Sequence, residues 1–283
     1  MLFRLYLCLL LNLFTPTTRL KRLHMSDKVS IVIPVKDRPN ELVRTLNSVL
    51  EQTHLNFEVI IIENNSVNPH EIARVVNLFN CRKFNLFNLQ ECSNANVARN
   101  YGAFKSTGDY IAFLDSDDEW EPNHLESSIS TLKRNKADFV YGGAVVFDGV
   151  SESFKEARDL LLDESPVDYL VGFNRGYAQT SSYLMKKTVL KKVIWDESLK
   201  RAQDLDFFIR VYKNFRCVCT NIYSSRINWL KGEKRNTDIQ AMLKFFKRYY
   251  KDMLPSSRVR YFMIILLNVK SISDIKSIFL AKE

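Results

Sequence analysis

The sequence predicts an α/β fold of the Rossmann-like, doubly wound class, with a mostly parallel central sheet and a helical C-terminal extension. Short apolar runs rich in β-branched residues alternate with stretches whose apolar residues recur at helical spacing. The chain has 283 residues, of which 46% are hydrophobic and 26% charged, and this composition is typical of a globular protein. It has only eight glycines and seven prolines, so no flexible linker separates two modules.

The first strand is expected at Val29–Val35, because a nearly continuous apolar run is typical of a strand buried on both faces of a parallel sheet. A helix should begin near Pro39 and place its apolar residues on one face. The second strand is expected at residues 57–62. The first unit is therefore a βαβ unit, and its crossover should be right-handed.

The same alternation continues along the chain. Further helices are expected at residues 70–79, 95–105 and 122–135, and further strands within 83–89 and at 110–114, 139–147 and 217–227. No G-x-G-x-x-G motif follows the first strand, which disfavours a dinucleotide as ligand. Three parts are expected: an apolar and basic N-terminal extension at 1–24, a catalytic domain at 25–225, and a basic helical extension at 226–283.

The net charge of +9 is unevenly distributed along the chain. Residues 1–24 carry +4, residues 226–283 carry +8, and the part between them carries −3. A slightly acidic core with basic ends is unlike a nucleic-acid groove and more like an enzyme whose ends meet an anionic surface. We therefore expect no nucleic acid as partner.

The apolar run at residues 2–14 is shorter than the roughly 20 residues needed to span a bilayer, and no small-residue cleavage site follows it. We expect Met25 to be the natural start. The five cysteines are odd in number and form no paired C-x-x-C sets, so neither a disulfide framework nor a zinc site is indicated. A reducing cytoplasm fits this pattern.

Polar clusters follow three of the predicted strands, where ligands of open α/β sheets bind. They are Lys36-Asp37-Arg38, Glu63-Asn64-Asn65-Ser66 and Asp115-Ser116-Asp117-Asp118. A single acidic loop is usually a solvated turn, but three clusters at strand ends indicate a site. The crowded carboxylates of the third cluster would repel one another unless a cation joins them, and Mg²⁺ or Mn²⁺ would bridge them to a diphosphate.

Three stretches carry a family resemblance. Residues 30–66 (SIVIPVKDRPNELVRTLNSVLEQTHLNFEVIIIENNS), 96–122 (NVARNYGAFKSTGDYIAFLDSDDEWEP) and 203–211 (QDLDFFIRV) resemble family 2 glycosyltransferases of the GT-A fold, of the bacterial polysaccharide type. The resemblance covers about residues 28–225. It implies an inverting transferase that moves a sugar from a nucleotide-diphosphate donor, with a UDP-sugar the expected donor, to a hydroxyl of a saccharide or lipid-linked acceptor.

The resemblance also implies roles for individual residues. It assigns Mg²⁺ or Mn²⁺ to Asp117 and Asp115, and the role of catalytic base to Asp204. Lys36-Asp37 stands where the family often has Tyr-Asn, and Glu63-Asn64 where it often has Asp-Asp, which leaves the base of the nucleotide open. The residues assigned to the nucleotide-sugar are Pro34, Lys36, Glu63, Asn64, Arg99, Asp115 and Ser116.

Asp204 has a second argument from the residues alone. It lies in the first turn of an expected amphipathic helix, where the helix dipole stabilises a carboxylate. The alternative is that Asp204 caps this helix and has no catalytic role. The resemblance favours the base.

The C-terminal part begins with a polar, basic stretch at 228–235, which either closes over the diphosphate or, more simply, is a solvated loop. A helix follows from Asp238 and ends before Pro255. Two alternatives remain for the helices of this part: packing on the catalytic domain, or peripheral contact with a membrane surface at the inner face of the cell membrane. The cations of the first helix are Lys244, Lys247, Arg248 and Lys251.

Two other classes of protein remain as alternatives. A nucleotidyltransferase would also use an acidic metal-binding pair, but it generally has a Gly-rich phosphate loop after the first strand, which this chain lacks. A non-catalytic module that binds sugar nucleotides or membranes would not need both Asp117 and Asp204.

Overall fold

The computed structural model describes residues 27–90, 94–229 and 238–269. Nine strands form one sheet in the order β3-β2-β1-β4-β8-β6-β9-β5, with β7 paired to β6. The strands are β1 Val29–Val35, β2 Phe57–Glu63, β3 Phe84–Asn88, β4 Tyr110–Phe113, β5 Glu119–Trp120, β6 Phe139–Phe147, β7 Glu152–Lys155, β8 Leu184–Lys186 and β9 Cys217–Asn228. The helices are α3 Pro39–Leu50, α4 Pro69–Leu78, α5 Ala95–Lys105, α6 His124–Arg134, α7 Pro166–Val171, α8 Gln203–Tyr212, α9 Ile239–Tyr249 and α10 Pro255–Leu267.

The first half of the described chain is a parallel α/β unit, as predicted. In β1, Val29 lies opposite Phe57 of β2 on one side and Tyr110 of β4 on the other, and both pairings are parallel. The strand β2 pairs in parallel with β3. Each helix predicted in this half is present within a few residues of its expected bounds, because local periodicity determines these elements.

The second half mixes strand directions. β8 runs antiparallel to both of its neighbours, β4 and β6, while β6 and β9 are parallel. Among the nine strands described, six run in one direction and only β5, β7 and β8 run in the other. The predicted α/β class with a mostly parallel sheet is confirmed, and the three reversed strands were not predicted.

Every residue of β1 is buried, which is why all of them except Ser30 are apolar. Alternate residues Val29, Ile31 and Ile33 join one core cluster, and Val32 joins the cluster on the opposite face. Helix α5 lies close on the second face, because a Cβ added at Gly102 would stand 2.4 Å from a methyl of Val32. The absence of a side chain at Gly102 thus allows α5 to approach the sheet.

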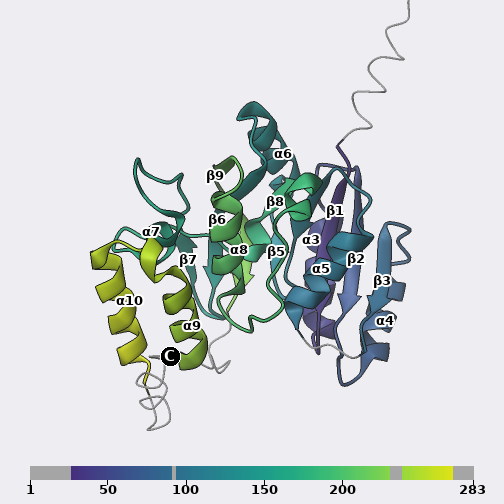
Figure 1. Cartoon of the computed structure of the whole chain (residues 1–283). Coiled ribbons are helices and arrows are strands. Elements are labelled where there is room, and N and C mark those ends of the chain that lie inside the picture. The colour runs from purple at the N-terminus through teal and green to yellow at the C-terminus, as the bar shows by residue number, and fades with distance from the viewer. Residues whose placement is uncertain (1–26, 91–93, 230–237, 270–283) are drawn as a thin grey trace, which may run out of the picture.

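The C-terminal extension packs on the domain through α9, so the packing alternative holds for that helix. Asp238 caps α9, accepting a hydrogen bond from the amide of Ala241 at 3.0 Å. The buried residues of α9 are Ile239, Leu243, Phe245 and Tyr249. Figure 1 shows α9 and α10 side by side at the end of the sheet that lies away from β3.

One boundary differs from expectation and another agrees with it. Strand β9 continues to Asn228 and therefore crosses the expected domain boundary at 225, because its residues 223–228 pair with β6. Helix α9 ends before Pro255, as predicted, and Pro255 itself stands in the first turn of α10, where its fixed φ angle and missing N–H are tolerated.

Some expectations fall outside the described residues. They concern the extension at 1–24, the start at Met25 and most of the loop after Asn228. In the described parts of the chain, no helix combines the length and the hydropathy that crossing a bilayer requires. Free thiols are described at Cys81, Cys217 and Cys219, and Cys219 is buried in β9.

Candidate functional site

A cavity of about 870 Å³ opens at the carboxyl ends of β1, β2 and β4. It brings together seven of the residues that the sequence indicated: Pro34, Lys36, Asn64, Arg99, Asp115, Ser116 and Asp117. The other lining residues are Val35, Asp37, Arg38, Ala95, Arg201, Gln203 and Trp229. Four cationic side chains face three carboxylates in this lining, and a cavity of this charge suits a ligand that carries phosphate groups.

The acidic segment at residues 115–118 is held by buried hydrogen bonds. It leaves the sheet directly after β4, whose residues are all buried. The hydroxyl of Thr45 in α3 donates to the backbone oxygens of Ser116 and Asp118, at 2.9 and 2.8 Å. These bonds fix the turn, so its side chains stand in defined positions at the rim of the sheet.

Each of the first two carboxylates is paired with an arginine. A terminal nitrogen of Arg99 lies 2.7 Å from an Oδ1 of Asp115. Arg38 forms an ion pair with Asp117. The mutual repulsion expected within this acidic cluster is therefore offset by two guanidinium groups of the same cavity.

Asp118 points away from the cavity and is almost completely buried. Its carboxyl accepts from the hydroxyl of Ser181 at 2.6 Å and from the amide of Asn228 at 3.3 Å. Burial and the nearby charges of Asp117 and Asp115 raise the pKa of Asp118 well above its ordinary value. Asp118 thus connects the acidic turn to β9 and takes no part in the cavity wall.

Arg99 is oriented by its own surroundings. Its guanidinium lies 4.6 Å from the ring centre of Trp195 and donates to the side-chain oxygens of Asn96 and Gln203, at 3.1 and 3.3 Å. Only 6% of the side chain is exposed. Arg99 therefore presents a fixed positive charge beside Asp115.

The ends of β1 and β2 are joined by a short network. The amide of Asp37 donates to the hydroxyl of Ser66 at 2.9 Å, and the amide of Val67 donates to the Asp37 carboxylate at 2.7 Å. Asp37 and Asn65 adopt left-handed backbone conformations, with φ of 53° and 60°, which short polar residues tolerate.

Glu63 and Asn64 have different positions in this network. Glu63 is buried and accepts from the amide of Ser66 at 2.6 Å, so it shapes the turn and does not line the cavity. Asn64 lines the cavity, and its buried Oδ1 has no hydrogen-bond partner among the residues that the structure describes. A buried acceptor without a donor is costly, and this one faces a space that a ligand could enter.

A second cavity of about 550 Å³ meets the first at Trp229, which lines both. Asp204 and Leu205 line the second cavity, together with Tyr177, whose buried hydroxyl has no hydrogen-bond partner in the described chain. The remaining lining residues are Phe154, Lys155, Glu156, Leu170, Arg175, Gly176, Ala178 and Gln179.

Asp204 stands in the first turn of α8, as predicted, but it does not cap the helix. The N-cap is Ala202, which has φ of 54° and makes no side-chain hydrogen bond, so the capping alternative for Asp204 is wrong. Burial raises the pKa of Asp204, while the amide of Leu205 and the charge of Arg99 counteract this shift. The carboxylate therefore takes up a proton more readily than an exposed aspartate.

Arg201 was not predicted as a site residue, whereas Arg38 belonged to the first of the three polar clusters. Trp229 was expected in a solvated loop, but it immediately follows β9, the kind of position that pointed to the clusters, so the same rule could have identified it. Arg201 lies just before α8 and reaches the cavity through the tertiary fold alone.

Asp117 and Asp115 offer carboxylate oxygens to the first cavity, the ligands that Mg²⁺ and Mn²⁺ prefer. Across the described ranges, no three His, Cys, Asp or Glu side chains gather into a complete metal site. The donor set fits a cation that takes one or two carboxylates and completes its shell with water and substrate phosphates.

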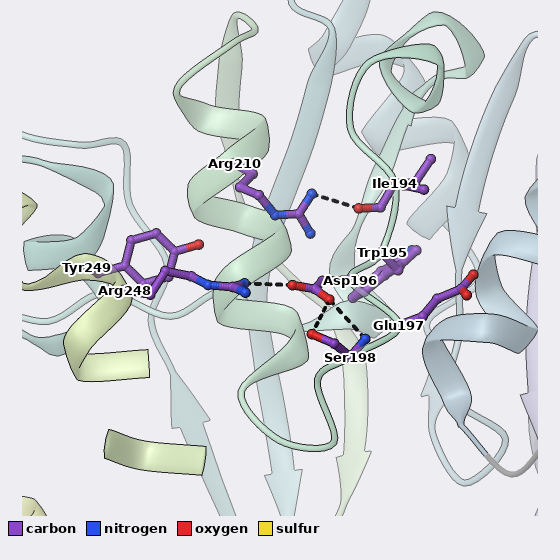
Figure 2. A pocket seen from close by; sticks show the side chains of 8 residues that line it. All are labelled: Ile194, Trp195, Asp196, Glu197, Ser198, Arg210, Arg248 and Tyr249. Atoms are coloured by element: carbon purple, nitrogen blue, oxygen red, sulfur yellow. Dashed lines mark hydrogen bonds and ion pairs between the residues drawn. The ribbon is translucent and has the colours of Figure 1, made fainter. Parts of the chain in front are cut away.

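A third, shallower cavity of about 670 Å³ lies between α8, α9 and the segment at residues 194–198. Figure 2 shows that two of its charged side chains are directed at neighbours in the lining: Arg248 pairs with Asp196 at 2.8 Å, and Arg210 donates to the backbone oxygen of Ile194 at 2.7 Å. Glu197 accepts from Asn100 at 2.8 Å. The cavity therefore lies where three elements meet, and its charged side chains are bonded within the protein.

The sequence matches a family model described as glycosyl transferase family 2 over residues 30–194, which is more than half of the chain. The chain belongs to glycosyl transferase family 2. Among curated members of the family, the amylovoran biosynthesis glycosyltransferase AmsB of Erwinia amylovora is 32% identical over 192 residues. The match covers 65% of this chain and 64% of AmsB, so the chain spans slightly less than two thirds of that relative.

Two solved structures resemble this family 2 chain. The structure of S. aureus TarS 1-349 in complex with UDP-GlcNAc has a TM-score of 0.68 at 18% identity, over 90% of this chain and 79% of TarS. The mannosyltransferase PcManGT from Pyrobaculum calidifontis, in complex with GDP-Man and Mn²⁺, has a TM-score of 0.55 at 14% identity. The match covers 91% of this chain and 69% of PcManGT. At these identities the likeness concerns the fold, and it confirms the predicted GT-A class.

Proposed function

We propose that this family 2 protein is an inverting glycosyltransferase of cell-surface polysaccharide synthesis. It transfers a sugar from a nucleotide-diphosphate donor to a hydroxyl of a saccharide or lipid-linked acceptor. The observation that carries the proposal is the meeting of two cavities at Trp229. One cavity has the cations and carboxylates that suit a diphosphate, and the other has Asp204.

The first cavity is the donor site in this proposal, and a UDP-sugar is the expected donor. Asn64 Oδ1 lacks a partner within the described chain and could accept a hydrogen bond from an N–H of uracil. Lys36 and Arg201 would meet the diphosphate, since cationic side chains are its usual partners. The TarS structure, which has the same fold, was solved with UDP-GlcNAc.

Asp117, with Asp115 beside it, would hold Mg²⁺ or Mn²⁺ in the donor site. When bound, such a cation neutralises charge on the departing diphosphate. Arg38 now pairs with Asp117, so this arginine would release or share the carboxylate when the cation binds. Arg99 keeps Asp115 oriented and balances its charge.

Asp204 would act as the base in the second cavity. It would accept the proton of the acceptor hydroxyl while that oxygen attacks the anomeric carbon from the side opposite the leaving diphosphate, and this geometry inverts the configuration. The raised pKa of Asp204, caused by burial, makes it a stronger base than an exposed aspartate. The hydroxyl of Tyr177 could donate a hydrogen bond to the acceptor, because its burial raises its pKa and keeps it protonated.

The experiment is a donor screen by nucleotide release with UDP-, GDP- and dTDP-sugars, followed by two variants. Asp117→Asn should remove most activity and the response to Mn²⁺, because a neutral amide binds the cation poorly. Asp204→Asn should lower turnover by about 10²- to 10⁴-fold and leave donor affinity nearly unchanged. Asp163→Asn is the matched control, since Asp163 is exposed and its left-handed backbone also suits asparagine.

Two results would contradict the proposal in different ways. Full activity in EDTA would remove the role of the cation, and equal loss of donor affinity in Asp204→Asn would make Asp204 a structural residue. Release of inorganic diphosphate from a nucleoside triphosphate would favour the nucleotidyltransferase alternative. Donor binding without turnover for any sugar would favour the non-catalytic module.

A further inference from the structure

Helix α10 carries an exposed apolar stripe that the donor and acceptor cavities do not explain. Met263 and Leu266 are 50% and 42% exposed, Val259 is 63% exposed and Leu267 is 80% exposed. Phe262 lies among them and is 37% exposed. The spacing of these five residues places them on one face of the helix, which we call the α10 stripe.

The opposite face of α10 is already packed. Tyr261 and Ile265 are buried, and the ring of Tyr261 lies 5.5 Å from that of Phe245 and 6.0 Å from that of Phe246 in α9. Helix α10 is thus attached to the domain through one face, and its stripe is directed outward. Figure 1 shows α10 as the outermost helix at its end of the molecule.

Two arginines flank the α10 stripe. At 3.6 residues per turn, Arg258 falls beside one edge of the stripe and Arg260 beside the other. Arg258 lies 4.2 Å from the ring centre of Tyr250 and donates to its backbone oxygen at 2.9 Å, and Arg260 donates to the backbone oxygen of Val171 at 2.5 Å. Helix α10 contains no acidic residue, so the surface is apolar at its centre and positive at its edges.

We infer that the α10 stripe docks on the surface of an anionic lipid bilayer. An apolar face bordered by cations is the pattern of helices that lie in the membrane interface, where the apolar side chains enter the acyl boundary and the cations meet anionic headgroups. The 13 residues of α10 extend about 20 Å, which is less than the roughly 30 Å of a hydrocarbon core. The helix therefore lies on the bilayer and does not cross it.

A second copy of the chain fits this surface less well. In a two-fold contact the same patch meets itself, so a patch whose charges in α10 are those of Arg258 and Arg260 would meet another patch of the same sign. Like charges brought together at an interface repel, whereas anionic headgroups attract both arginines. Charge complementarity thus favours lipid as the occupant.

The test is co-sedimentation of the full chain with vesicles, and its result does not depend on glycosyl transfer. The chain should pellet with vesicles of phosphatidylglycerol and phosphatidylcholine at low salt, and much less with phosphatidylcholine alone. The triple variant Val259→Gln, Met263→Gln, Leu267→Gln should lower the bound fraction at least tenfold with an unchanged circular dichroism spectrum, because these side chains are exposed. Arg258→Gln should weaken binding about fivefold, as expected for one cation near an anionic surface.

The matched control is the variant Leu55→Gln, Leu78→Gln, Phe104→Gln, which removes apolar side chains that are 70%, 73% and 79% exposed from the first half of the domain and should bind like the parent chain. Leu267→Trp provides a readout that does not depend on the folding of the triple variant: its fluorescence should be quenched by brominated lipids in anionic vesicles. Equal binding of the triple variant and the parent, equal binding to neutral and anionic vesicles, or no binding at all would overturn the inference. Loss of a dimer in the triple variant, without any vesicle binding by the parent, would identify a second copy as the occupant.

Discussion

Arg248 of α9 donates a hydrogen bond of 2.6 Å to Asp206 of α8, the helix that also carries Asp204. The same carboxylate oxygen of Asp206 accepts from the hydroxyl of Tyr249, and its other oxygen accepts from Arg210 at 2.7 Å. Only 1% of the Asp206 side chain is exposed. The C-terminal extension is therefore connected to the helix that positions the proposed base through an ion pair between the buried Asp206 and the partly exposed Arg248.

Replacing Arg248 should loosen this connection. We expect Arg248→Met to lower the free energy of unfolding by about 1 to 3 kcal/mol, since Asp196 and Asp206 would both lose an ion pair, while Asp206 would keep Arg210 and the hydroxyl of Tyr249 as partners. Chemical denaturation measures the change. Lys247→Met, the neighbouring exposed cation, is the control and should change the stability by less than about 0.5 kcal/mol. Similar losses of stability in both variants would show that the effect comes from the overall charge of the protein and not from this ion pair.

The pH dependence of turnover should respond to Arg99. Burial raises the pKa of Asp204, the charge of Arg99 lowers it, and the charge of Asp115 raises it. In Arg99→Met the lowering influence is lost, so the pKa of Asp204 rises. Because the base works only when deprotonated, the acidic limb of the kcat profile should move to higher pH.

The kcat profile is measured at saturating donor concentration, so that weaker donor binding by the variant does not change the measured rate. Arg201→Met serves as the control, since Arg201 lines the same cavity and is not among the charges that shift Asp204. An acidic limb that stays in place in Arg99→Met would exclude Asp204 as the titrating base.

Glu58 should contribute to stability at neutral pH and lose that contribution in acid. Burial alone would raise its pKa, but hydrogen bonds from Lys28, Ser30 and Thr107 outweigh burial and lower the pKa to about 2. A lowered pKa stabilises the fold above the ordinary value of 4.5, and this stabilisation is lost as the pH falls towards about 2.

We expect Glu58→Gln to lower the free energy of unfolding by about 2 kcal/mol at pH 7 and to change it little at pH 2. Urea denaturation over this pH range measures both values. The exposed Glu51→Gln serves as control. A loss of stability of the same size at both pH values would show that the shape of the Glu58 side chain, and not its ionisation, explains the effect of the substitution.

Trp229 should affect donor and acceptor together, because it lines both cavities. We expect Trp229→Ala to raise the KM for each substrate about tenfold through the loss of aromatic contact surface. Trp229→Phe keeps a ring at this position and should recover most of the affinity. A change in only one of the two KM values would place the indole in a single subsite.

The sequence predicted the elements whose pattern is local. The apolar run of β1 and the helical spacing in α3 are visible in neighbouring residues. The bounds of β1 and α5 and the start of α3 at Pro39 were therefore predicted almost to the residue. Strands β5 and β8 have two and three residues and no measurable period. They form only because distant strands offer them an edge, so local sequence could not reveal them.

The same distinction applies to the candidate site. Asp115, Asp117 and Asn64 follow strand ends, and the rule for open α/β sheets brought them to one cavity. The ion pairs of Arg38 and Arg99 depend on how turns and helices meet in three dimensions, so they could not be predicted. Glu63 was assigned to the cavity by the family resemblance, but its carboxylate accepts from the amide of Ser66 in the turn that follows β2 and does not line the cavity.

The position of β8 has a consequence for the biosynthesis of the chain. It separates β4 from β6, although β6 is synthesised before it. Until the ribosome has produced residues 184–186, one edge of β4 has no partner, and an open strand edge is a template for aggregation. We expect nascent chains of about 150 residues to be captured by chaperones and full-length chains to be released from them, which ribosome-bound chains of defined length can test.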